Sequence, residues 1–375
     1  MPATAVEISN YTWTHAGRAQ PAVDKLNLRI PAGERVLICG DSGSGKSTLV
    51  SAIAGVLGGD EEGDQTGSLK LSDDSGTREA ADSMIPVGLV LQDPDSQVIA
   101  SRVGDDVAFG CENLGLERTE IWRRVREALP LVGLDLPLDH PTAQLSGGQK
   151  QRLALAGVIA MRPGIIILDE PTANLDPQGA HDVVAAVANV VEHTGATLLV
   201  VEHNYEVWED VLERGLEFAS GRLVDDAPAR EIIARRRISG LPRAQIKLAK
   251  NSAALTAESV TATEQPTHLP PRSLELPAHA STVITGENGA GKTTLLMTLA
   301  GLRPLASGSI EFSESIRDGL RGPVAKWKSR QLAQRIGYVF QNPEHQFVAR
   351  TVLEELHVGP KVMGIKAVSY THLTL

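Results

Sequence analysis

Residues 40–47 read GDSGSGKS and fit the phosphate-binding pattern G-x-x-x-x-G-K-[ST]. Glycines in such a loop let successive backbone N–H groups turn inward around phosphate oxygens. We expect the ammonium of Lys46 to contact the β and γ phosphates of ATP and the hydroxyl of Ser47 to ligate Mg²⁺. The nucleotide contacts predicted for this loop are Gly40, Asp41, Ser42, Gly43, Ser44, Gly45, Lys46, Ser47 and Thr48.

The same loop occurs a second time. Residues 282–302 read TVITGENGAGKTTLLMTLAGL, so an apolar strand, a glycine-rich turn and a helix recur in the same order. The repeat continues, because residues 92–97 (QDPDSQ) and 341–346 (QNPEHQ) share the pattern Gln-x-Pro-x-x-Gln. Thr293 is the Mg²⁺ ligand expected here, and the predicted nucleotide contacts are Gly286, Asn288, Gly289, Ala290, Gly291, Lys292, Thr293, Thr294 and Gln341.

A pair of carboxylates follows a strongly apolar segment. Residues 165–176 read IIILDEPTANLD, and the apolar start is typical of a central parallel strand that is buried on both faces. Acidic residues at the carboxyl end of such a strand lie where ligands bind. We therefore expect Asp169 to hold Mg²⁺ and Glu170 to polarise the attacking water as general base, which predicts hydrolysis of ATP.

A second anion site is expected at residues 145–152, which read LSGGQKQR. Ser146 and the backbone N–H groups of Gly147 and Gly148 open a helix there, with Gln149 as a further contact. With this segment the chain resembles the ABC ATPase family, whose signature is LSGGQ. The resemblance implies that the signature of one domain covers the γ phosphate bound to the phosphate loop of another domain, in a head-to-tail pair.

The same resemblance implies roles for several single residues. Gln92 is similar to the Q-loop glutamine, which contacts magnesium and water and faces the membrane partner. His203, in LLVVEHN, is similar to the switch histidine that touches the γ phosphate, and Asp176 to the D-loop aspartate at the shared interface. Trp13, which we prefer over Tyr11, is expected to stack on adenine, as an aromatic residue does in this family.

An α/β fold is needed to position these residues. The resemblance implies a phosphate-loop ATPase domain with a mostly parallel central sheet, a β-rich subdomain near the N-terminus and a helical subdomain over residues 99–155. The 375 residues suit two domains. We expect a complete domain over residues 1–240, a linker over 241–255 and a partial second domain over 256–366. Residues 367–375 are expected to be a non-native tail, because VSYTHL resembles a translated sequencing adapter.

The second half is expected to be incomplete. It ends near the equivalent of Leu129, so it lacks counterparts of Asp169, Glu170 and His203. We expect an unfinished sheet with an unpaired edge in this half. We also expect the chain to bind ATP weakly and hydrolyse little unless two first domains pair.

Charge and composition exclude several classes of protein. The net charge of −10 argues against electrostatic binding of nucleic acid, so no nucleic-acid partner is expected. Cys39 and Cys111 are too few for a disulfide framework or a four-cysteine zinc site, which favours a reducing compartment. No apolar run reaches the roughly 20 residues that span a bilayer. Any membrane role is therefore expected to be peripheral, at the cytoplasmic face, through integral membrane transporter subunits. A basic cluster at residues 235–237 fits either the end of the first domain together with a linker or a solvated charged helix.

The doubled Gln-x-Pro-x-x-Gln resembles the ATPases of energy-coupling factor importers and related cobalt-type systems, which take up vitamins and metal ions. The expected function is therefore ATP hydrolysis that powers transport of a small nutrient. Another ABC system for import or export is the nearest alternative, and a non-hydrolysing scaffold is disfavoured because Lys46, Asp169, Glu170 and His203 are all present. A soluble ABC ATPase of translation or DNA repair is a further alternative, disfavoured by the absence of long heptad insertions and by the acidic charge.

Overall fold

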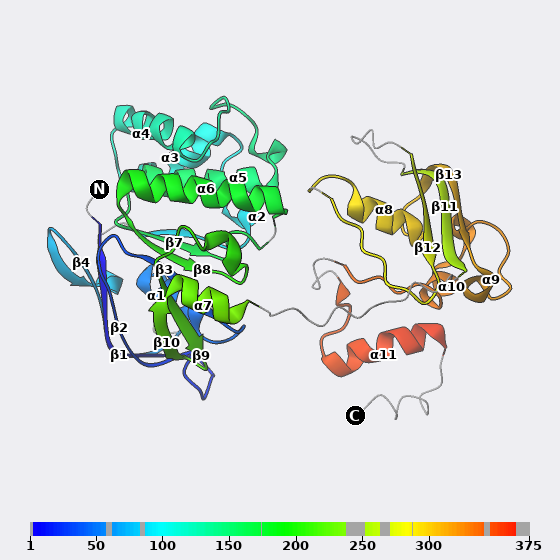
Figure 1. The fold of residues 1–375 in the computed structure, drawn as a ribbon, viewed down its shortest axis with the longest axis horizontal. Helices are drawn as coiled ribbons and strands as arrows, with labels where there is room; N and C mark the ends of the chain where they lie inside the picture. The colour runs from blue at the N-terminus through cyan, green and yellow to red at the C-terminus, as the bar shows by residue number, and fades with distance from the viewer. Residues whose placement is uncertain are drawn as a thin grey trace. The chain divides into compact units, whose positions relative to one another are not determined.

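The computed structural model describes residues 3–57, 62–82, 87–173, 175–237, 252–262, 271–286, 288–340 and 346–364. The chain forms two compact units, Met1–Arg243 and Ala244–Leu375 (Figure 1). The first strand of the second unit, β11 (Ala253–Ala262), begins inside the segment 241–255. That part of the expected linker is therefore corrected to strand.

A six-stranded sheet forms the centre of the first unit. Five strands run parallel and the edge strand β10 is antiparallel to β9. In sheet order the strands are β10 (Arg222–Pro228), β9 (Arg214–Ala219), β3 (Arg35–Gly40), β8 (Thr197–Val201), β7 (Ile165–Asp169) and β6 (Val87–Val90). The apolar runs of β7 and β8 are buried, as expected for strands that are covered on both faces.

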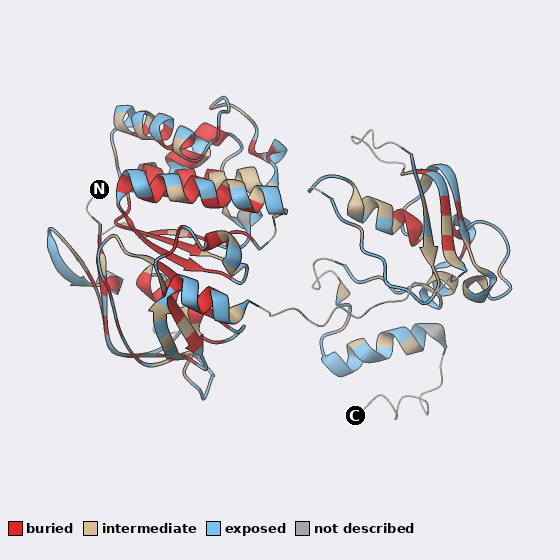
Figure 2. Ribbon diagram, viewed as in Figure 1, coloured by how far each residue is buried: buried red, intermediate tan, exposed pale blue. Residues whose placement is uncertain are grey.

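Helices cover both faces of this sheet. In Figure 1, α5 (Gly147–Ala160) and α6 (Pro177–Thr194) lie on one side of the sheet, and α1 (Lys46–Ile53) lies on the other. The buried residues of α7 (Ala229–Arg236) belong to the same core as those of α5 and α6. Alternate residues of β7 enter two different cores: Ile166 packs with the α5 and α6 side, whereas Ile167 packs with α1 and the N-terminal strands. Figure 2 shows the sheet as a buried layer between these helices.

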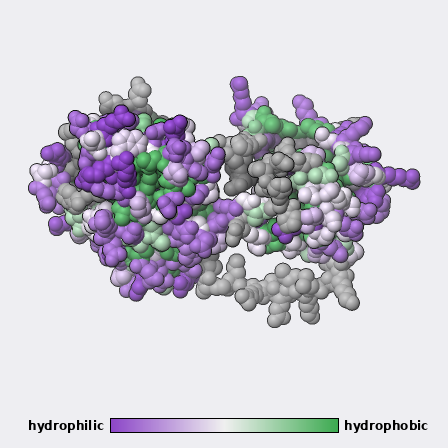
Figure 3. Space-filling model, turned by 90° about the horizontal axis from the view of Figure 1, so that it is seen from above, coloured by the Kyte–Doolittle hydropathy of each residue, from purple (hydrophilic) through white to green (hydrophobic). Residues whose placement is uncertain are grey.

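The two expected subdomains are present in the first unit. The β-rich subdomain is an antiparallel sheet in the order β2-β1-β4-β5, formed by β2 (Val23–Ile30), β1 (Ala5–His15), β4 (Gly63–Asp73) and β5 (Gly76–Glu79). The helical subdomain contains α3 (Val103–Asn113), α4 (Arg118–Leu131) and the first part of α5. Seen from the side of these helices, the first unit presents mostly hydrophilic surface around smaller hydrophobic areas (Figure 3).

The basic cluster at residues 235–237 closes the first unit. Arg235 and Arg236 end α7, and an ion pair joins Arg236 to Glu217 of β9 at 2.6 Å. Arg237 bonds through its guanidinium to Glu206 at 3.0 Å. The cluster is therefore a paired helix end of this unit.

The described part of the second unit has a three-stranded antiparallel sheet in the order β12-β11-β13. Besides β11, its elements are β12 (Arg272–Pro277), α8 (Lys292–Leu299), β13 (Leu305–Phe312), α9 (Glu314–Arg317), η4 (Val324–Lys326), α10 (Ser329–Ala333) and α11 (Val352–Met363). The strand predicted at residues 282–285 is wrong, since these residues have no regular structure. Their first-unit equivalent β3 pairs with β8 and β9, which have no counterparts among the described residues of this unit.

Candidate nucleotide-binding and catalytic site

The first phosphate loop connects β3 to α1. Its glycines Gly40, Gly43 and Gly45 have φ angles of 145°, 77° and 99°, in the region that favours glycine. A Cβ atom on Gly40 would lie 2.2 Å from the carbonyl oxygen of Phe218, and one on Gly45 would lie 2.0 Å from that of Ala22. At Gly40 and Gly45 the backbone therefore passes too close to neighbouring backbone for any side chain.

Lys46 is held inside this loop. The residue is 5% exposed, and its Nζ donates hydrogen bonds to the carbonyl oxygens of Gly40 at 2.8 Å and Asp41 at 2.9 Å. Burial lowers the pKa of Lys46, and the nearby carboxylates of Glu170 and Asp169 act in the opposite direction. The ammonium thus lies at the loop with two acids of the site close enough to affect its charge.

Asp169 ends β7 next to Ser47. Its Oδ1 is buried and has no hydrogen-bond partner. Burial raises the pKa of Asp169, and a hydrogen bond from Ser47 opposes that rise. A buried carboxylate oxygen without a donor is costly, and a divalent cation would remove that cost. Asp169 and Ser47 therefore fit Mg²⁺ as a pair of oxygen ligands.

Glu170 gathers two of the other expected residues. Gln92 Nε2 donates to Glu170 Oε2 at 2.7 Å, and His203 Nε2 lies 3.2 Å from Glu170 Oε1. The backbone of Glu170 has φ of 49°, which is uncommon for a residue with a side chain and recurs at functional sites. Both carboxylate oxygens are thereby oriented by side chains from two different loops.

The segment that presents Gln92 is fixed by the second glutamine of its motif. Gln97, at the end of α2 (Pro94–Gln97), accepts from Leu91 N and donates to Leu91 O, both at 3.0 Å. An ion pair between Asp95 and Lys150 joins α2 to the signature helix α5. The pattern Gln-x-Pro-x-x-Gln therefore has a structural reason, because its last residue clamps the backbone just before its first.

The signature segment begins α5 with a capping box. Ser146 Oγ accepts from Gln149 N at 3.3 Å, and Gln149 Oε1 accepts from Ser146 N at 2.9 Å. Ser146 is exposed, and Gly147 and Gly148 form the first turn after it. Asp176 caps α6 with its side chain, whose Oδ1 accepts from the N–H of Gly179 at 2.7 Å. The helix start of α5 is thus open to an approaching anion.

The glycines of the second phosphate loop have backbone angles similar to those of the first. Gly286, Gly289 and Gly291 have φ angles of 149°, 79° and 83°. Lys292 Nζ donates to Gly286 O at 2.7 Å, which repeats the bond from Lys46 to Gly40. Lys292 is more exposed than Lys46, and the described residues of this unit include no counterparts of β8 and β9, the strands beside β3 in the first unit. Gln341 lies outside the described residues.

The repeat also extends to the segment after the Q-loop. Glu355 Oε2 accepts backbone hydrogen bonds from Val348 and Ala349 at 3.0 and 2.8 Å. Asp106 Oδ2 does the same in the first unit for the two residues after Val98, at 2.8 and 2.9 Å. Conserving these contacts at the same register supports two related domains.

Protein-family comparison agrees with this geometry. Residues 23–173 and 269–371 match the family model described as ABC transporter. The chain belongs to the ABC transporter family. It is an ATP-binding protein of that family and an ATPase of the ABC type.

Individual relatives of this ABC ATPase cover most of the chain. An ABC transporter ATP-binding protein of Methanosarcina acetivorans, so named provisionally, is 31% identical over 97% of this chain and 68% of its own length. A Bacillus subtilis protein with the provisional name HMP/thiamine import ATP-binding protein YkoD is 31% identical over 94% of this chain and 71% of its own length. The solved structure of cbiO1 from Clostridium perfringens, part of the ABC transporter complex cbiONQ, has 30% identity and a TM-score of 0.53, covering 61% of this chain and 90% of cbiO1.

The adenine contact of the ABC ATPase needs a correction. Trp13 is only 1% exposed, so its ring cannot stack on a base in this structure. Its Nε1 instead donates to Nδ1 of His15 at 3.3 Å, and His15 Nε2 lies 3.1 Å from the hydroxyl of Thr48 in the phosphate loop. His15 is therefore the aromatic ring of β1 that reaches the nucleotide loop, with Trp13 behind it.

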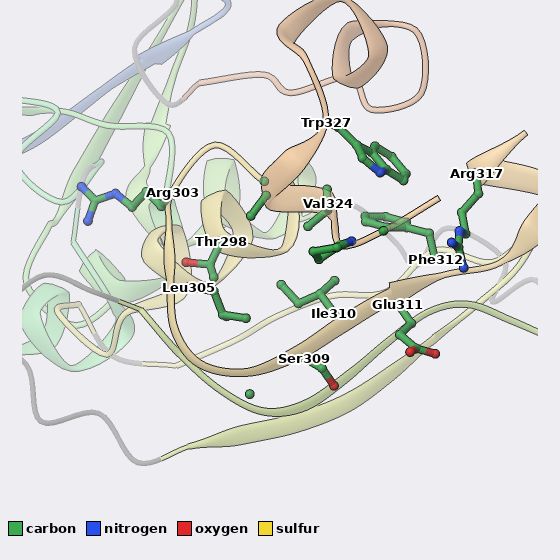
Figure 4. Close-up of a pocket in the computed structure, with 15 residues that line it drawn as sticks. Thr298, Arg303, Leu305, Ser309, Ile310, Glu311, Phe312, Arg317, Val324 and Trp327 are labelled. Carbon is green, nitrogen blue, oxygen red and sulfur yellow. The ribbon is translucent and has the colours of Figure 1, made fainter. Parts of the chain in front are cut away.

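Two cavities of the second unit differ in relevance to nucleotide binding. One of 360 Å³ lies under β13 and η4, where Val324, Phe312 and Trp327 line it (Figure 4). None of its lining residues belongs to the phosphate loop. Another, of 550 Å³, is lined in part by Gly286 and Lys292, so it is the one adjacent to the second phosphate loop.

Three residues that position this site were not predicted from the sequence. Gln97 could have been found, because the repeat preserves its spacing from Gln92. His15 and Glu202 carried no signal, since one reads as a strand end and the other as a polar residue before His203. Glu202 is 1% exposed and accepts hydrogen bonds from Thr172, in the loop of Glu170, and from the backbone of His203.

Proposed function

We propose that this ABC ATPase powers the import of a small nutrient, a vitamin or a metal ion, as a peripheral subunit at the cytoplasmic face of the membrane. The observation that carries this proposal is the doubled Gln-x-Pro-x-x-Gln loop, whose last glutamine clamps Leu91 and directs Gln92 to Glu170. Similarity to a provisionally named HMP/thiamine importer ATPase and to cbiO1 supports an importer. A role in translation or DNA repair has no such support.

The proposed nucleotide site is shared between two ATPase domains. ATP lies on the phosphate loop of one domain, with Lys46 at the β and γ phosphates. Ser146 and the N–H groups of Gly147 and Gly148 cover the γ phosphate from the other domain, as the open start of α5 allows. Asp176 lines the same interface. The pairing is head-to-tail.

The proposed chemistry belongs to the first unit. Glu170 is the general base, Gln92 orients its carboxylate, and His203 lies at the γ phosphate. Mg²⁺, when bound by Ser47 and Asp169 with Gln92 nearby, neutralises charge on the phosphate oxygens. Thr293 is the corresponding ligand in the second unit.

His15 replaces Trp13 as the proposed contact of the base. Its edge is fixed by the indole of Trp13 and by Thr48, so the ring is held in one orientation beside the phosphate loop. A fixed ring loses little conformational freedom when a base stacks on it. His15 would bind adenine by stacking, whereas Lys46 would bind the phosphates.

Membrane subunits are proposed to dock beside the Q-loop. Leu91, Ile99 and Phe109 are 43%, 61% and 38% exposed, which supplies apolar surface along this segment. None of the helices in the described part of the chain has the length and apolarity that a membrane crossing needs. ATP-driven closure of paired domains would then move the docked subunits.

Reconstitution tests this function. The chain is co-purified with the membrane proteins encoded beside its gene and placed in vesicles, and uptake of labelled thiamine precursors and of Co²⁺ and Ni²⁺ is measured. We expect ATP-dependent uptake of one substrate, which Glu170→Gln removes while the complex stays assembled. Uptake that persists in Glu170→Gln, or efflux in place of uptake, would contradict the proposal.

A further inference from the structure

A buried carboxylate connects the two loops that carry Glu170 and His203. Glu202, directly after β8, is 1% exposed. Its Oε2 accepts from Thr172 Oγ1 at 2.6 Å, and its Oε1 accepts from His203 N at 2.8 Å. Thr172 is itself buried and follows Glu170 by two positions.

Two more donors complete the environment of this carboxylate. Asn204 N donates to Oε1 at 3.2 Å, and Trp208 Nε1 donates to Oε2 at 3.4 Å from η3 (Tyr205–Trp208). All four donors are uncharged groups. Burying a carboxylate costs free energy that only several well-placed hydrogen bonds offset, so this arrangement needs a reason beyond filling the core.

The strand pairing alone does not fix the two loops beyond the sheet. The backbone of β7 and β8 is paired up to Asp169 and Val201, and Glu170 N donates to Val201 O at 2.8 Å. Beyond the paired strands, the Glu202 carboxylate accepts hydrogen bonds from Thr172 in the loop of Glu170 and from the backbone N–H of His203. Its carboxylate therefore links the two loops beyond the end of the strand pairing.

We propose that Glu202 is a positioning residue that, through Thr172 and the backbone of His203, holds the imidazole of His203 at the carboxylate of Glu170. The inference rests on the proposed roles of Glu170 and His203. Without the Glu202 bonds, the 3.2 Å separation of His203 Nε2 and Glu170 Oε1 would not be maintained. A displacement of about 1 Å at such a site can lower the rate about a hundred-fold.

The hydroxyl of Thr172 provides the sharpest test. Thr172→Val keeps the side-chain shape and removes the donor, whereas Thr172→Ser keeps the donor and is the matched control. Hydrolysis and ATP binding by the whole chain are measured together with its thermal unfolding midpoint. We expect Thr172→Val to lower kcat about ten- to a hundred-fold with KM changed less than about two-fold, and Thr172→Ser to retain most of kcat.

Glu202→Gln is the second variant, since it keeps the volume of the side chain and loses its charge. It is expected to lower kcat as Thr172→Val does, and the two together are expected to lower it no further than either alone. Glu170→Gln is measured in parallel. Wild-type hydrolysis by Glu170→Gln would contradict the proposed base, whereas a wild-type kcat in Thr172→Val, or a loss that Thr172→Ser does not restore, would overturn the inference about Glu202.

Discussion

Gln92 donates a hydrogen bond to Glu170 at 2.7 Å, although 78 positions separate the two residues in the chain. The other carboxylate oxygen of Glu170 faces His203 Nε2 at 3.2 Å. One side chain thus receives contacts from the loops after β6 and β8, the strands on either side of its own strand β7. Both carboxylate oxygens of the proposed base are therefore oriented by side chains from neighbouring loops.

Glu170→Gln tests the proposed base. The amide keeps the size of the side chain but cannot accept a proton from water, so we expect hydrolysis to fall by about a hundred-fold or more. Nucleotide affinity should remain close to wild type, because Lys46 and the phosphate loop are unchanged. Phosphate release and binding of a fluorescent ATP analogue provide the two measurements. Robust hydrolysis by this variant would contradict the assignment.

The two phosphate loops provide a matched comparison for lysine. Lys46 is buried within its loop, whereas Lys292 lies in a more exposed one. A charge-assisted bond is worth about 1.5–3 kcal/mol, so Lys46→Ala should weaken ATP binding about ten- to a hundred-fold. Lys292→Ala should weaken the binding of ATP to the first phosphate loop much less. Titration with a fluorescent ATP analogue distinguishes them, and unchanged affinity in Lys46→Ala would exclude this loop as the principal site.

The meeting of Gln92, Glu170 and His203 could be predicted from the sequence with one physical rule. Each residue follows an apolar run, and the carboxyl ends of neighbouring parallel strands meet at one edge of a sheet. The order β8-β7-β6 makes those three runs neighbours. The phosphate loops were predictable for a similar reason, because their glycines are required by local backbone geometry.

The incorrect prediction for Trp13 shows that a local sequence pattern does not determine which residues of an irregular strand are buried. Residues of β1 alternate in burial until Ile8, where the pairing register shifts, and Asn10 has φ of 47°. This irregularity makes Trp13 buried and leaves His15 beside the phosphate loop. A sequence with period-two alternation does not reveal where a bulge falls. The strand at residues 282–285 failed for a related reason, since a strand needs neighbours to pair with.

His15→Ala tests the proposed base contact. Loss of a stacked ring costs about 1–3 kcal/mol, so ATP affinity should fall about five- to a hundred-fold. Trp13→Phe keeps a ring behind His15 but removes the donor to Nδ1, and it should show a smaller fall of the same kind. Isothermal titration calorimetry with ATP and with inorganic tripolyphosphate distinguishes binding of the base from binding of the phosphates, because tripolyphosphate has no base. An equal loss for tripolyphosphate would assign His15 to the loop rather than to adenine.

Asp169 should make stability depend on pH and on Mg²⁺. Burial raises its pKa above the ordinary 3.8, so the folded state binds the proton more tightly than the unfolded state. The contribution of Asp169 to the free energy of unfolding is therefore greatest below its pKa in the unfolded state. This contribution is lost as the pH rises through its pKa in the folded state. Near neutral pH without Mg²⁺, Asp169→Asn should therefore unfold at a temperature a few degrees higher than wild type.

The control for this prediction is an exposed acid. Asp74→Asn, in the turn between β4 and β5, should leave the unfolding midpoint nearly unchanged, because the side chain is exposed. The advantage of Asp169→Asn should shrink as the pH approaches the unfolded pKa, because the carboxyl is then protonated in both states. Mg²⁺ with nucleotide should raise the midpoint of wild type more than that of Asp169→Asn. If Mg²⁺ stabilises both proteins equally, the buried Oδ1 of Asp169 is not a ligand, and the cation is held by phosphate and Ser47 alone.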